Sequence, residues 1–142
     1  MPKFEQAIVL RLVSQLQNAL GRLESLQKLS QKEFMKDPDK IGSCKYQFIV
    51  AIESCIDMCN HIIARNGYRV PEDYGDTFKV IAEAGVIDET FVIELRNMAK
   101  FRNRLVHLYW EINDEQVYDI LQTRVKDFKK LIKALYAFLN IL

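Results

Sequence analysis

Residues 40–67, KIGSCKYQFIVAIESCIDMCNHIIARNG, decide the fold of this chain. Their apolar residues recur at intervals of three and four, which is the period of an α-helix with one buried face. The pattern predicts a helix over residues 40–66, and Gly67 is well placed to end it as a left-handed C-terminal cap. The apolar stripe of this helix consists of Phe48, Ile49, Ile52, Cys55, Ile56, Cys59 and Ile63.

Segments with the same periodicity precede and follow this helix. A first helix is predicted over residues 4–30, and the sequence Asp-Pro-Asp at residues 37–39 then indicates a turn or a helix start. After Gly67 a loop leads to a short predicted helix over residues 77–83, which should end at Gly85.

Two capping signals place the remaining helices. Asp88 can cap a helix whose apolar face reaches Leu105. Asn113, with Gln116 three residues later, resembles a capping box for a final helix over residues 114–140. Strand-like alternation and internal repeats do not stand out. We therefore predict an all-α fold, an antiparallel bundle of four main helices plus one short helix, in a single domain of residues 1–142.

The composition is that of a soluble globular protein. Lys and Arg number 20 against 19 Asp and Glu, so any RNA binding must come from a local patch and not from the overall charge. The chain has no run of 18 apolar residues and no signal-peptide pattern at its start, so no membrane span is expected. The odd set Cys44, Cys55 and Cys59 is typical of reduced cysteines in the core of a cytoplasmic protein.

The stretch RNRLVHLY at residues 102–109 is best suited to chemistry. An imidazole such as that of His107 can accept or donate a proton near neutrality. The planar guanidinium of Arg102 suits phosphate oxygens, and Tyr109 offers a phenol that can donate to a phosphate or stack on a base. A base, an acid and a cation are what cleavage of RNA by its own 2′-hydroxyl requires without a metal.

Helical geometry separates these groups. At about 100° per residue, Arg102 and His107 lie roughly 140° apart on a straight helix, whereas Arg102 and Tyr109 nearly align. A shared site therefore needs a bend or a crossing element, and we favour a two-fold homodimer that places two copies of the motif opposite each other. By spacing alone, the commoner alternative is a structural His107 near a helix end, with Arg102 and Arg104 complementing the helix dipole.

The same stretch resembles the signature of the HEPN superfamily, an arginine followed by four residues and a histidine. The tyrosine two residues further on resembles the HepT-like toxin branch of that superfamily. Residues 51–63, AIESCIDMCNHII, and residues 75–87, GDTFKVIAEAGVI, resemble the same branch, and the similarity spans residues 46–111. Two positions depart from the pattern, since Lys100 stands where glycine is frequent and Leu108 where an acidic residue is frequent.

The resemblance implies an all-helical homodimer with a metal-independent endoribonuclease site at the dimer cleft, no cofactor, and tRNA or mRNA as substrate. It further implies a type VII-like toxin whose partner, an MNT-type nucleotidyltransferase antitoxin, transfers AMP to the motif tyrosine. Carried over by position, Arg102 and His107 are the catalytic pair, Asn103 is a supporting group and Tyr109 is the modified residue. The alternative is a non-catalytic helical binding partner for the nucleotidyltransferase.

Other polar residues extend the candidate site. Glu53, Asp57 and His61 lie beside the core face of the central helix and could line the cleft, although each alone is more often a solvated residue. Lys100 and Arg104 are the best candidates for RNA contacts because they lie within or next to the motif. No metal site is expected, because Asp57 and His61 have no second histidine–carboxylate pair to complete one.

Overall fold

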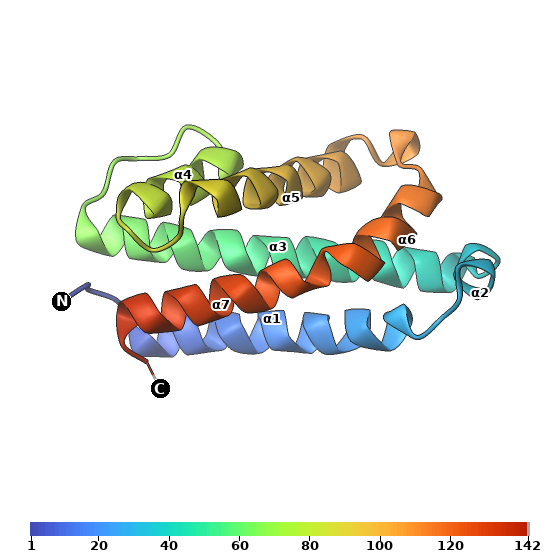
Figure 1. The fold of residues 1–142 in the computed structure, drawn as a ribbon, viewed down its shortest axis with the longest axis horizontal. Coiled ribbons are helices and arrows are strands. Elements are labelled where there is room, and N and C mark those ends of the chain that lie inside the picture. Colours follow the sequence, from blue (N-terminus) through green and yellow to red (C-terminus); the bar gives the residue numbers. More distant parts are fainter. Residues whose placement is uncertain (142) are drawn as a thin grey trace.

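A computed structural model describes residues 1–141, in which the chain forms seven α-helices and one 3₁₀ turn, with no strand. The long helices run alternately in opposite directions along one axis, so the predicted all-α antiparallel bundle is confirmed (Figure 1). In chain order the elements are α1 (Gln6–Gln27), α2 (Gln31–Met35), α3 (Pro38–Asn66), α4 (Tyr74–Glu83), α5 (Glu89–His107), η1 (Tyr109–Glu111), α6 (Asp114–Thr123) and α7 (Val125–Leu139).

Side-chain caps define where most of these helices begin. Asp37, Asp73, Asp88 and Asn113 precede α3, α4, α5 and α6, and each accepts hydrogen bonds from backbone N–H groups of the first turn. Gly67 ends α3 with φ at 65°, a left-handed conformation that costs glycine no steric strain. The predicted caps at Asp88, Asn113 and Gly67 are therefore confirmed.

The first predicted helix is wrong at its C-terminal end. It was expected to continue to Ser30, but α1 ends at Gln27 and a separate short helix, α2, follows. Ser30 begins α2 through a reciprocal capping box with Glu33. Five residues are too few to produce a recognisable hydrophobic period, so only this capping pair could have indicated α2 in the sequence.

The final predicted helix is wrong as one continuous element. It divides at Arg124, where φ is −112°, into α6 and α7. Thr123 Oγ1 donates to the carbonyl of Asp119 at 2.8 Å, a backbone contact of the kind that bends helices. The break lets α6 pack on α2 and α3 while α7 packs on α1 and α3. No proline or glycine marks this position, so the periodicity continues across it undisturbed.

Helix α3 is the centre of the core, and within residues 1–141 it contacts each of the six other α-helices. Its predicted apolar stripe is largely buried, and each fully buried aliphatic or aromatic side chain contributes about 1.5–3 kcal/mol of transfer free energy. By length and composition α3 could also cross a membrane. However, 56% of its most apolar window is buried inside the protein, which its place in the core explains.

The cysteines are free thiols in this core. Burial raises the pKa of the Cys44 thiol to about 12 and also raises the pKa values of Cys55 and Cys59. The prediction of reduced, core-packed cysteines is thus confirmed, and their protonated thiols are poor nucleophiles.

Candidate active site

Arg102 lies in the second half of α5, and its guanidinium is held by three neighbours. Its Nε and Nη2 donate to Glu53 Oε1 of α3 at 3.1 and 2.6 Å, and its Nη1 donates to Asn103 Oδ1 at 3.1 Å. The guanidinium carbon of Arg102 also lies over the ring of Tyr74, the first residue of α4, at 4.9 Å from the ring centroid. Only 12% of the Arg102 side chain is exposed. The arginine is therefore a fixed cation, and within the described chain two of its five N–H groups remain available to a ligand.

His107 is the exposed last residue of α5. Together with Arg102 it lines an open pocket of about 430 Å³, whose opposite wall consists of Asp73 and Tyr74. Helix α5 is continuous from Glu89 to His107. Arg102 and His107 therefore keep the angular separation expected on one helix, and no break in α5 brings them together. The start of α4 instead provides the crossing element that completes the pocket.

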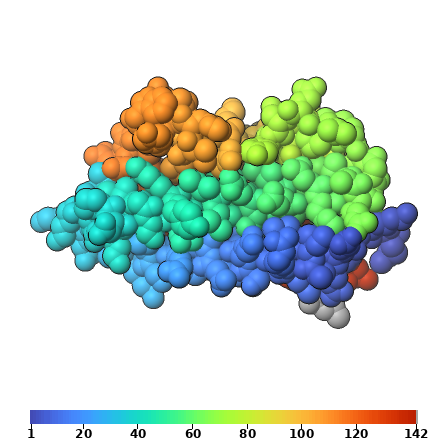
Figure 2. Space-filling view, turned by 180° about the vertical axis from the view of Figure 1, so that it is seen from behind, coloured from blue at the N-terminus to red at the C-terminus, as the bar shows by residue number. Residues whose placement is uncertain are grey.

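The same face can be followed in the space-filling view. Figure 2 shows two raised regions, one formed by the end of α5 with η1 and the other by the loop before α4 and its first turn. Helix α3 forms the floor of the hollow between them. The residues that line the Arg102–His107 pocket come from these two raised regions. The candidate site is therefore open to a large ligand, such as a polymer lying across α3.

The other polar residues of the motif lie around this pocket. Asn103 and Arg104 line it together with His107. Lys100 lies one turn earlier, in a neighbouring pocket of about 290 Å³ that it shares with Arg96 and Asn103. The structure thus brings Asn103 and Arg104 to the predicted catalytic pair and places Lys100 beside them.

Tyr109 lies outside the pocket. Helix α5 ends at His107, and Leu108, with φ −131° and ψ 37°, turns the chain into η1. The near alignment of Arg102 with Tyr109 that a continuous helix would give is therefore wrong. The Tyr109 side chain packs edge-on against Trp110 with ring centroids 5.3 Å apart, and it remains 66% exposed. It is thus accessible to a second protein.

Of the three polar residues predicted on α3, Glu53 makes the direct contact with the motif. Asp57 lies one turn further along α3, where partial burial and then the neighbouring Glu53 carboxylate raise its pKa, while Arg102 opposes the shift. His61 is held elsewhere, because its Nε2 accepts a hydrogen bond from the backbone N–H of Glu5 at 2.9 Å. Partial burial lowers the pKa of His61, which favours the neutral ring that this bond requires.

Sequence reasoning missed Asp73 and Tyr74. Asp73 Oδ1 accepts a hydrogen bond from the N–H of Asp76 at 2.7 Å, which fixes Tyr74 as the first residue of α4. The pair of acidic residues three positions apart before an apolar run was an available capping signal. The contact between Tyr74 and Arg102 had no such signal, because it depends on how α4 packs against α5.

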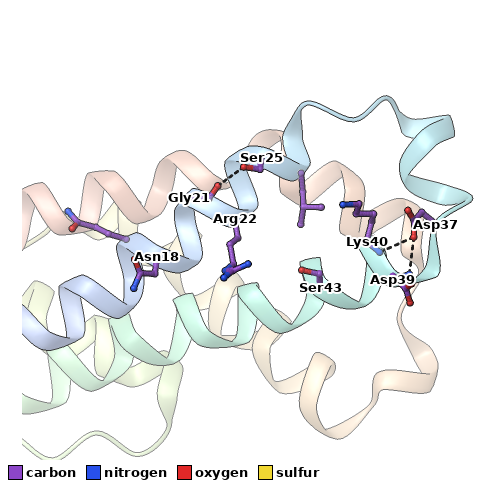
Figure 3. A pocket seen from close by; sticks show the side chains of 10 residues that line it. Asn18, Gly21, Arg22, Ser25, Asp37, Asp39, Lys40 and Ser43 are labelled. Carbon is purple, nitrogen blue, oxygen red and sulfur yellow. Dashed lines mark hydrogen bonds between the residues drawn. The ribbon is translucent and has the colours of Figure 1, made fainter.

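The other cavities described here for residues 1–141 do not combine an arginine with a histidine. One such cavity, of about 920 Å³, lies between α1 and the start of α3 (Figure 3). Its charged lining residues are Arg22, Lys40, Asp37 and Asp39, so its charges balance, and Asp37 is already engaged as the cap of α3. Within residues 1–141, no three His, Cys, Asp or Glu side chains are grouped closely enough to hold a metal ion.

Comparison with known proteins gives the family. The chain matches the family model described as Ribonuclease HepT-like over residues 16–135, most of its length. The chain belongs to the HepT-like ribonuclease family. The resemblance predicted from the motif is therefore confirmed.

Relatives of this HepT-like chain include the mRNA nuclease HepT of Shewanella oneidensis, which is 32% identical over 85 residues. That alignment covers 60% of the present chain and 64% of the Shewanella protein, slightly less than two thirds of its length.

Solved structures share the fold of this HepT-like chain. A tri-AMPylated HEPN toxin of Shewanella oneidensis in complex with MNT antitoxin superposes with a TM-score of 0.86 at 24% identity, covering 94% of this chain and 99% of that one. YutE, a cytosolic protein of Bacillus subtilis of unknown function, superposes with a TM-score of 0.84 at 17% identity, covering 99% and 94% respectively. At these identities the similarity establishes the common helical architecture.

Proposed function

We propose that this HepT-like chain is the toxin of a type VII-like toxin–antitoxin pair and cleaves RNA as a metal-independent endoribonuclease. The main support is that Arg102 and His107, roughly 140° apart around α5, line one open pocket. The ordinary alternative, a structural histidine, is disfavoured because the His107 side chain is exposed and no tertiary hydrogen bond holds it within residues 1–141. Similarity to the mRNA nuclease HepT supports RNA, either mRNA or tRNA, as the substrate class.

The chemistry follows from the protons that must move. His107 as a base removes the proton of the 2′-hydroxyl, and the 2′-oxygen bonds to phosphorus. The bond from phosphorus to the 5′-oxygen breaks, and a protonated imidazole gives its proton to that leaving oxygen. The products are a 2′,3′-cyclic phosphate and a 5′-hydroxyl. The two free N–H groups of Arg102 stabilise the charge that builds up on the phosphate oxygens.

We propose that the active form is a two-fold homodimer of this single-domain chain. One imidazole cannot hold the proton of an acid and act as a base at the same moment, whereas two copies of His107 facing each other can share these roles. The hollow over α3 between the two raised regions is open to solvent, so a second copy can approach it (Figure 2).

The proposed partner is an MNT-type nucleotidyltransferase antitoxin that transfers AMP to Tyr109. The structural relative from Shewanella oneidensis, an AMPylated HEPN toxin in complex with an MNT antitoxin, supports this pairing. The 66% exposure of Tyr109 makes its side chain accessible to such an enzyme. Tyr109 directly follows Leu108, which lines the Arg102–His107 pocket. An adenylyl group on Tyr109 therefore adds bulk and negative charge beside this pocket, which would oppose RNA binding.

Replacement of His107 tests the nuclease assignment. Purified protein should cleave RNA in the presence of EDTA, and His107→Ala should lower the rate by about 10²–10⁴-fold, the usual contribution of a general acid or base. The fold should remain intact in circular dichroism, because His107 is exposed. His61→Gln is the matched control, since it removes the other histidine of the chain, which lies outside the pocket. Full cleavage by His107→Ala would discard the assignment.

A further inference from the structure

A second pocket adjoins the Arg102–His107 pocket, and Tyr74 separates the two. This second pocket has a volume of about 600 Å³ and lies between the C-terminal end of α3 and the loop that leads into α4. Tyr74 and Asp73 line both pockets. Most of the remaining lining is apolar and includes Ile63, Ala64, Tyr68, Val70 and Pro71.

The polar part of this lining consists of the acidic residues Glu72 and Asp73 on the loop side, and of Asn60 and Thr77. Thr77 Oγ1 donates to Asn60 Oδ1 at 3.1 Å, so the oxygen of the amide is already engaged. The amide nitrogen of Asn60 makes no hydrogen bond within residues 1–141. An amide donor among apolar and aromatic side chains suits a flat ligand that carries hydrogen-bond acceptors at its edge.

The pocket is formed before any ligand arrives. Arg69, at the start of the connecting loop, donates to Asp76 at 2.7 Å and to Glu83 at 2.9 Å, which ties the loop to α4. This contact fixes the segment that carries Val70 and Pro71. A preformed site loses less conformational entropy on binding than one that must be ordered by its ligand.

We propose that this second pocket binds the nucleobase next to the scissile phosphate, stacked against Tyr74. The inference rests on the proposed ribonuclease function and adds a specificity site to it. Single-stranded RNA is recognised mainly by bases that splay out and stack on aromatic side chains. The guanidinium of Arg102 lies 4.9 Å from the Tyr74 ring centroid, so a phosphate at Arg102 and a base beside Tyr74 can belong to neighbouring nucleotides of one strand. Asn60 then donates to an acceptor on the base edge.

A substrate without that base tests the proposal. The cut site is first located in a short RNA, and the same RNA is then made with an abasic nucleotide on either side of the cut. At one of these positions the wild-type kcat/KM should fall roughly 5- to 150-fold, the effect expected for loss of one base–aromatic stack. Tyr74→Ala should cleave the intact and abasic RNAs at nearly equal rates. Tyr74→Phe keeps the ring and should retain the base dependence.

Asn60→Ala provides a second variant in case Tyr74→Ala folds poorly. In this variant the buried Thr77 hydroxyl can still donate a hydrogen bond to the carbonyl of Asp73, which lies 3.3 Å away. It should reduce the rate differences among the four bases at the same position. Ile93→Ala is the matched surface control, because Ile93 is 60% exposed and lies about 180° from Arg102 around α5.

Three outcomes would overturn the proposal. If Tyr74→Ala loses activity by the same factor on intact and abasic RNA, Tyr74 serves only to position Arg102 and does not stack on a base. Base dependence that is unchanged in Tyr74→Ala, with lost binding of the nucleotidyltransferase antitoxin, would assign the pocket to a protein partner. Wild-type cleavage without any base dependence would refute the base site alone. If wild type does not cleave RNA and His107→Ala does not bind it in fluorescence anisotropy, the ribonuclease function fails as well.

Discussion

The motif nominates Arg102 and His107 as the proposed catalytic pair, but it does not indicate what surrounds the guanidinium of Arg102. Its guanidinium lies between a carboxylate from α3 and an aromatic ring from α4, and both come from outside the motif. The Glu53 carboxylate partly neutralises the positive charge of Arg102, and its hydrogen bonds also fix the orientation of the guanidinium. The balance of these two effects determines what the loss of Glu53 does to catalysis.

We expect orientation to be the larger effect. Glu53→Ala should lower kcat for RNA cleavage by about tenfold or more, because a small misplacement of a group that stabilises the transition state is costly. Glu53→Gln should retain most of kcat, since its amide oxygen can accept the same bonds from Arg102. Single-turnover cleavage at saturating RNA measures both variants. Equal kcat for Glu53→Ala and wild type would show that Arg102 needs no fixing.

Tyr109 is expected to be separable from catalysis. It lies on η1, outside the Arg102–His107 pocket. Tyr109→Phe should therefore cleave RNA within about threefold of wild type, a difference below 1 kcal/mol. Wild type co-expressed with its antitoxin should carry an AMP addition in mass spectrometry, whereas Tyr109→Phe should lack it and should continue to inhibit growth. AMP found at another residue of Tyr109→Phe would contradict the assignment of Tyr109.

At the scale of elements, α4 contributes most to the site for its size. This short helix supplies one wall of the Arg102–His107 pocket and one wall of the second pocket. Its position depends on the loop before it, which Arg69 ties to Asp76 and Glu83. Asp76 is nearly buried, with 11% of its side chain exposed, so it depends on this guanidinium.

Loss of that tie should destabilise the protein in a pH-dependent way. Arg69→Ala should lower the free energy of unfolding at pH 7 by about 1–2 kcal/mol, because a nearly buried carboxylate loses its charged partner. Arg69 lowers the pKa values of Asp76 and Glu83 in the folded protein, so their stabilising contribution is present above the unfolded pKa of about 4 and is lost as the pH falls below it.

Urea unfolding at pH 7 and pH 3 measures this effect. The difference in unfolding free energy between wild type and Arg69→Ala should be large at pH 7 and should shrink at pH 3. Lys133→Ala, which removes one exposed positive charge from α7, is the control and should change stability little at either pH. A difference that persists unchanged at pH 3 would mean that Arg69 acts through packing and not through its ion pairs.

At the scale of the whole molecule, local sequence signals predicted where most helices lie. Tertiary packing determined where the last helix breaks and which side chains meet at the candidate site. The apolar stripe of residues 40–66 and the caps at Asp88 and Asn113 are local patterns, and the structure confirms them. The break at Arg124 and the contact of Tyr74 with Arg102 follow from how helices pack on one another, which no short sequence pattern encodes. The placement of His61 against the N-terminal segment is of the same kind.

The proposed assembly of two copies leads to the last prediction, which concerns how many His107 imidazoles the cleavage of one phosphodiester bond requires. Heterodimers of one wild-type chain and one His107→Ala chain can be purified with two different affinity tags. If each chain cut RNA with its own pocket, such a heterodimer would keep half of the wild-type activity. If two His107 rings share the acid and base roles in one cleft, its activity should fall by about 10²-fold or more, close to that of the His107→Ala homodimer. A heterodimer of wild type with His61→Gln should remain fully active, and sedimentation velocity should show the same dimer in all cases. If the heterodimer of wild type with His107→Ala keeps half of the wild-type activity, the pocket completed by α4 within each chain is sufficient for cleavage.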